Sequence, residues 1–129
     1  MKGFERKNDS SILGFVVLCN SMKAINFEEF KEFLYLLIKN TVEELPAFIW
    51  DLIDLEERNL SDIYQVIGFV PSSNLNDSER SAIYGITIKR FGSFFDMPIS
   101  KNKALKALNE NIQVLERFKN TFPFIKLDF

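Results

Sequence analysis

The sequence contains no histidine, one cysteine, one tryptophan and only five glycines in 129 residues. Without histidine, the commonest catalytic base at neutral pH is missing. A single cysteine excludes an intramolecular disulfide and a metal site built from several thiolates. The glycines are scattered, so the chain has no glycine-rich loop of the kind that cradles phosphate groups. These absences weigh against the commonest classes of enzyme.

Long apolar runs are also missing, since no run approaches the ~20 residues that span a bilayer. The first ten residues mix acidic with basic side chains and lack the pattern of a secretory signal. We therefore expect a cytoplasmic protein. Cys19 ends the apolar run 12–19, and no histidine exists to activate its thiol. We expect a buried, unreactive cysteine there.

Apolar residues make up 47% of the chain, and fourteen of them are phenylalanines. Phenylalanine buries a large area without a polar atom to satisfy. A chain of this length buries enough surface to fold without a disulfide or a metal. We predict one globular domain spanning residues 1–129.

Several helix starts are indicated by capping residues. Asn26 and Asn76 each precede acidic residues placed in a first helical turn, where the helix dipole favours anions. Ser100 precedes apolar residues at steps of three and four, and their spacing predicts one helix from there to a stop at Pro123. The inner face of this helix is expected to consist of Leu105, Leu108, Ile112, Leu115 and Phe118.

The middle of the chain shows weaker signals. Pro46 suits the first turn of a new helix. Ser61 is expected to cap a short helix that ends near Gly68. The closing residues 122–125 are expected to pack back on the core.

These patterns predict an all-α fold, a compact bundle of five to six helices. An α+β fold stays open as the alternative, with a small three-stranded sheet over 12–19, 63–70 and 83–89. The first of these segments is apolar on nearly every side, and Tyr84, Ile86 and Ile88 alternate as a strand would.

Acidic residues concentrate in one stretch, from 27 to 62. That stretch holds ten acidic and three basic residues, a net charge of −7, whereas the whole chain carries only −2. Such a concentration indicates a surface that binds something basic. Direct binding of nucleic acid is disfavoured, because the pI is about 5.2 and the lysines and arginines form no dominant cluster.

Asp51 and Asp54 lie one helical turn apart, so both can face one cation, act as an acid and base pair, or belong to a docking surface. Two carboxylates are too few for a typical hard-cation site, and a solvated helix face is the plain interpretation. We predict neither a metal site nor a cofactor. Trp50 is either a core residue or an interface anchor ringed by carboxylates.

Several segments carry a resemblance that runs over most of the chain. They are residues 13–20 (LGFVVLCN), 45–54 (LPAFIWDLID), 67–72 (IGFVPS), 83–86 (IYGI), 89–91 (KRF) and 122–125 (FPFI). Together they resemble small immunity proteins of bacterial contact-dependent growth inhibition and related polymorphic toxin systems. The resemblance implies a non-catalytic, cytoplasmic inhibitor that binds one cognate toxin domain, often a nuclease, and occludes its active site.

We therefore expect carboxylates to pair with basic groups of the toxin, while Trp50, together with Tyr64, anchors the contact. The candidate partner-binding residues are Glu43, Glu44, Trp50, Asp51, Asp54, Glu57, Asp62 and Tyr64. A helical adaptor or regulatory subunit that binds another cellular protein is the alternative from a different class. An enzyme that uses carboxylates or lysine is the third.

Overall fold

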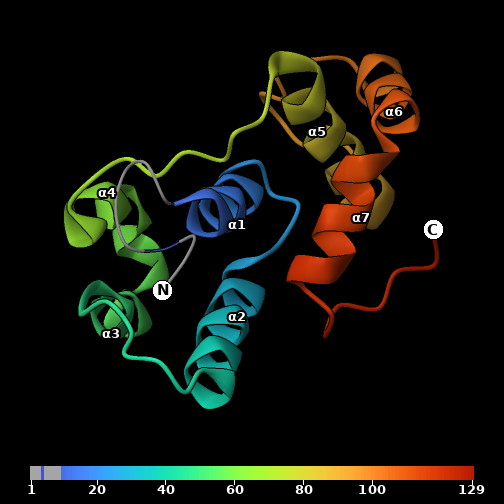
Figure 1. The fold of residues 1–129 in the computed structure, drawn as a ribbon. Helices are drawn as coiled ribbons and strands as arrows, with labels where there is room; N and C mark the ends of the chain where they lie inside the picture. Colours follow the sequence, from blue (N-terminus) through green and yellow to red (C-terminus); the bar gives the residue numbers. More distant parts are fainter. Residues whose placement is uncertain (1–3, 5–9) are drawn as a thin grey trace. The chain divides into compact units, whose positions relative to one another are not determined.

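A computed structural model describes Phe4 and residues 10–129, and every regular element in those residues is a helix (Figure 1). In chain order the elements are α1 (Ser11–Ser21), α2 (Phe27–Asn40), α3 (Phe48–Asp54), the 3₁₀-helix η1 (Glu57–Asp62), α4 (Ile63–Ile67), α5 (Asp77–Phe91), α6 (Lys101–Glu110) and α7 (Ile112–Thr121). The all-helical prediction is confirmed. The alternative with a three-stranded sheet is wrong for the part of the chain described.

The three capped helix starts are confirmed by their hydrogen bonds. The side chain of Asn26 accepts from the backbone amide of Glu29 at 2.8 Å, and the Glu29 carboxylate accepts from the Asn26 amide at 2.9 Å. Asn76 and Glu79 form the same reciprocal pair at the start of α5. Ser100 accepts from the amide three residues on, at 3.2 Å. Each bond satisfies an amide that the helix itself leaves without a partner.

Residues 83–89 lie in the helix α5, which is buried on more than one side. Ile83, Ile86 and Ile88 are buried, but so is Thr87, which a half-exposed strand would turn outward. The Thr87 hydroxyl donates to the carbonyl of Met22 at 2.9 Å. The alternating isoleucines therefore reflect a helix enclosed by neighbours rather than a pleated strand.

The predicted last helix is divided in two at Asn111, so α6 and α7 stand where one helix was expected. This break raises the count to seven α-helices in the described residues. Asn111 leaves the helical region with φ −130° and ψ 56°. Its buried amide group donates to Ser78 Oγ and to the carbonyl of Ala107, each at 2.9 Å. An asparagine that bonds in this way competes with the helical backbone ladder.

The break also changes the predicted inner face, because Ile112 is 54% exposed. The closing segment behaves as expected at Phe122, which is fully buried against Phe118 with ring centroids 4.9 Å apart. Ser61 is not a cap, because it lies within η1 and α4 is preceded by Asp62. Gly68 ends α4 as predicted, with φ 91°.

The chain forms two compact units. The first comprises Asn26–Asn74 together with the chain up to Leu18, and the second comprises Cys19–Ile25 and Leu75–Phe129. In the first unit Phe30, Leu34, Ile49 and Leu52 are fully buried. One domain spanning 1–129 stays a prediction.

The predicted buried cysteine is confirmed, because the Cys19 side chain has no exposed surface. Burial raises the pKa of the Cys19 thiol well above its usual range, while the nearby Arg117 opposes that shift. The thiol therefore stays protonated at neutral pH, and only the thiolate is an effective nucleophile.

We expect Cys19 to react with iodoacetamide at least about 100-fold more slowly in the folded protein than in denaturant. The rate of alkylation followed by mass spectrometry measures this difference. Similar rates in both conditions would show that the thiol is accessible.

Candidate functional site

The two units differ in charge. Asn26–Asn74 of the first unit holds ten acidic and three basic residues, a net charge of −7. The second unit holds ten basic and six acidic residues, a net charge of +4. Nine of the ten carboxylate side chains in Asn26–Asn74 are exposed, and the tenth, Glu29, is half-buried in its capping box. The exposed carboxylates of the acidic stretch therefore all belong to the first unit, and their convergence into one binding surface stays a prediction.

Helix α3 presents one polar and one apolar side. Ile49 and Leu52 are fully buried, whereas Trp50, Asp51 and Asp54 are exposed. At about 100° per residue, Asp54 lies about 40° from Trp50 around the helix axis and Asp51 about 100°. The tryptophan and both carboxylates consequently share one exposed sector of a short helix.

Trp50 is 53% exposed, so its interpretation as a core residue is wrong. The apolar side of α3 is already filled by Ile49 and Leu52, which leaves the indole ring outside. A large ring that is half in contact with solvent and borders carboxylates has the composition of an interface anchor.

Lys31 ties α2 to α3. Its ammonium group donates a hydrogen bond to the carbonyl oxygen of Ile53, in the last turn of α3. Burial lowers the pKa of Lys31, and the carboxylates of Asp54 and Glu56 oppose that shift. A cation at the carbonyl end of a helix complements the helix dipole. The bond fixes the acidic end of α3 against α2.

A groove lies where α2 ends and α3 begins. Ile38 and Thr41 line it at the end of α2, Glu43, Glu44 and Leu45 in the connection, and Ala47 and Trp50 at the start of α3. Its open volume is about 480 Å³. The structure thus brings together three of the predicted residues, Glu43, Glu44 and Trp50.

The other five predicted residues belong to the same unit but do not line the groove, and two of them, Asp51 and Asp54, lie on α3. Glu57 and Asp62 lie in η1 and Tyr64 in α4, and all three are exposed. Asp51, Asp54 and Glu57 are spaced three residues apart, which in one helix would place them on a common side, but Glu57 follows the end of α3 and lies outside that helix. The groove's apolar lining was missed, because the sequence pattern marks Ile38 and Leu45 only as apolar.

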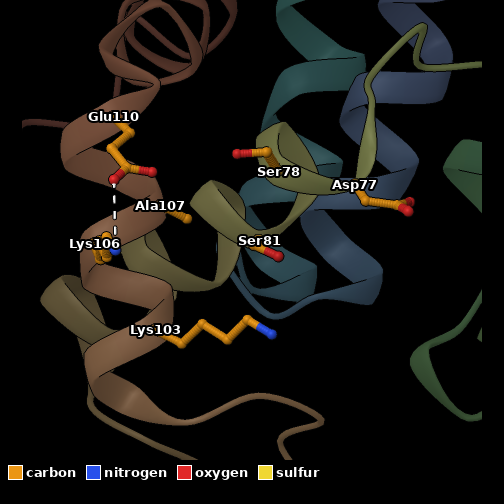
Figure 2. A pocket seen from close by; sticks show the side chains of 7 residues that line it. All are labelled: Asp77, Ser78, Ser81, Lys103, Lys106, Ala107 and Glu110. Carbon is orange, nitrogen blue, oxygen red and sulfur yellow. Dashed lines mark ion pairs between the residues drawn. The ribbon is translucent and has the colours of Figure 1, made fainter.

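A second hollow, of about 330 Å³, lies in the second unit between α5 and α6. Figure 2 shows the side chains that line it: Asp77, Ser78 and Ser81 come from the start of α5, and Lys103, Lys106 and Glu110 come from α6. Lys106 and Glu110 form an ion pair at 3.9 Å. Two cations and two anions line this hollow, so its charge favours neither an anionic nor a cationic ligand.

Within Phe4 and 10–129, no three histidine, cysteine, aspartate or glutamate side chains gather in a way that can hold a metal ion. None of the helices in the same ranges combines the length and the apolar character that crossing a bilayer requires.

Comparisons with models of known protein families, with curated proteins and with solved structures found no match. The function proposed below therefore rests on the charge, exposure and shape of the site together with the resemblance described above.

Proposed function

We propose that the chain is a non-catalytic, immunity-type inhibitor that binds a basic toxin domain of nuclease type and covers its active site. The binding surface is the acidic face of the first unit, and the setting is the bacterial cytoplasm. The observation that carries the proposal is the gathering of exposed carboxylates around an exposed tryptophan on one unit.

The chemistry of a nuclease cleft supports this partner. A cleft that binds a phosphate backbone is lined by lysine and arginine, because neutralising phosphates supplies much of the affinity. A protein surface with a similar density of negative charge competes for the same groups. Complementary charge also speeds association and rejects partners of the wrong sign.

Carboxylates and aromatic residues contribute to binding at an interface in different ways. Exposed carboxylates at a rim act mainly on the association rate and its dependence on salt. Aromatic residues that become buried in a partner supply most of the affinity. Asp51 and Asp54 therefore steer the toxin, and Trp50 holds it after contact.

The proposal predicts a toxin domain encoded directly upstream of this chain, and it is tested by titrating the chain into that domain. Nuclease activity is expected to fall linearly and to vanish near one equivalent, because each inhibitor covers one active site. Stopped-flow mixing of the two proteins is expected to show slower association in 1 M salt, since the screening length then falls to about 3 Å.

Two results would contradict the proposal. Full nuclease activity at a large excess of the chain would favour the adaptor alternative. Complete loss of activity far below one equivalent would indicate turnover, and therefore an enzyme.

A further inference from the structure

The groove at the α2–α3 connection combines three chemical features in one place. Glu43 and Glu44 supply two exposed carboxylates, Trp50 supplies an indole ring with half its surface exposed, and Ile38 with Leu45 supplies apolar lining. Few single side chains complement all three features. An acidic side chain would be repelled, and a purely apolar one would leave the carboxylates without a partner.

Arginine complements each feature. Its planar guanidinium group stacks on an aromatic face, and its fork of N–H donors matches a carboxylate in a bidentate pair. Its methylene stem covers apolar surface while the charged end reaches polar groups. Lysine offers the charge and the stem, but its ammonium group neither stacks as a plane nor binds a carboxylate with two parallel bonds.

We propose that this groove is the binding site for an arginine side chain of the partner, stacked on Trp50 and paired with Glu43 or Glu44. The proposal deepens the function proposed above, since it names the group on the basic toxin that this part of the acidic surface binds. The carboxylates on the rest of the unit then provide the negative electrostatic field that attracts the basic partner.

The test uses the full chain and two small probes, N-acetyl-arginine amide and N-acetyl-citrulline amide, which differ mainly in charge. Trp50 is the only tryptophan, so its indole N–H gives one NMR signal that belongs to the groove. We expect arginine amide to shift this signal and the backbone signals of Glu43 and Glu44 with one saturable dissociation constant. Citrulline amide is expected to leave them in place.

A matched pair of variants separates the groove from the general field. Glu43→Gln with Glu44→Gln removes two negative charges from the groove, and Glu28→Gln with Glu32→Gln removes two from exposed positions on α2 outside it. The groove variant is expected to bind arginine amide at least about five-fold more weakly, and the control less than about two-fold. Trp50→Ala, followed by the backbone signals, is expected to lose a similar factor.

Three outcomes would overturn the proposal: no saturable shift with arginine amide, equal shifts with citrulline amide, or equal weakening in the two glutamine variants. Its failure is distinguishable from that of the proposed function. Toxin inhibition without arginine binding would support the acidic surface as the toxin-binding site but contradict the role of the groove as an arginine site. Arginine binding without toxin inhibition would support the groove as an arginine site but contradict the proposal that the partner is a nuclease toxin.

Discussion

Replacing Asp51 and Asp54 together by lysine is expected to lower the affinity for the basic toxin domain that we propose as the partner by about 100-fold or more. The two substitutions change the charge of one exposed helix sector by four units, and they do so beside Trp50. Attraction to basic groups of the partner becomes repulsion at the same positions. Surface plasmon resonance at low and moderate salt measures both the affinity and the association rate.

The fold is expected to tolerate this change, with the free energy of unfolding altered by less than about 1 kcal/mol. Both side chains are exposed. Lysine at position 54, at the end of α3, complements the helix dipole better than aspartate does, whereas lysine at position 51, in the first turn, complements it less well. A lysine at position 54 opposes this gain by repelling Lys31, because position 54 lies close enough for the Asp54 carboxylate to raise the pKa of Lys31.

A control with the same change in net charge is Glu116→Lys with Asp128→Lys, two exposed positions of the second unit. Affinity is expected to fall much less in this control. Equal losses in the two variants would mean that only the net charge of the chain matters. Unchanged affinity in the Asp51 and Asp54 variant would remove this surface as the docking site.

Replacing Gly14 by alanine is expected to lower the free energy of unfolding by about 2–3 kcal/mol. A Cβ atom at Gly14 would lie 2.4 Å from the carbonyl carbon of Ser72 and 2.6 Å from the amide nitrogen of Ser73. These neighbours are backbone atoms, which no side-chain rotation can move. The contact is also held by Ser10, whose buried hydroxyl accepts from the Ser72 amide at 3.0 Å.

The sign of this result is informative, because alanine within a helix is ordinarily favoured over glycine by about 1 kcal/mol. Ser21→Ala, at an exposed position of the same helix, serves as the control and is expected to change stability by less than about 0.5 kcal/mol. Urea denaturation followed by circular dichroism measures both. A Gly14→Ala variant as stable as the parent would mean that α1 and the segment around Ser72 do not pack closely.

Features fixed by neighbouring residues could be predicted from the sequence. The helix starts at Asn26, Asn76 and Ser100 depend on hydrogen bonds to an amide three residues away, so a short window contains all the information. The exposure of Asp51 and Asp54 follows in the same way from the helical spacing of Ile49 and Leu52.

Features that depend on residues far apart in the chain could not be predicted from the sequence. The helix break at Asn111 depends on Ser78, which lies 33 residues earlier in the chain. The apolar repeat through Ile112 gave no warning of it, because periodicity records only the local preference. The groove around Trp50 also escaped prediction, since its shape depends on how the end of α2 and the start of α3 are fixed, and Lys31 joins them across 22 residues.

The division of the chain has a consequence for genetic dissection. Residues 19–25 belong to the second unit, although more than 45 positions separate them from its remainder. Arg90 holds the carbonyl of Ala24 at 2.8 Å, and Thr87 holds that of Met22. Truncation after Asn74 would therefore strip buried Ala24 and Ile25 of the unit to which they belong. Neither half can be expressed intact by a single cut.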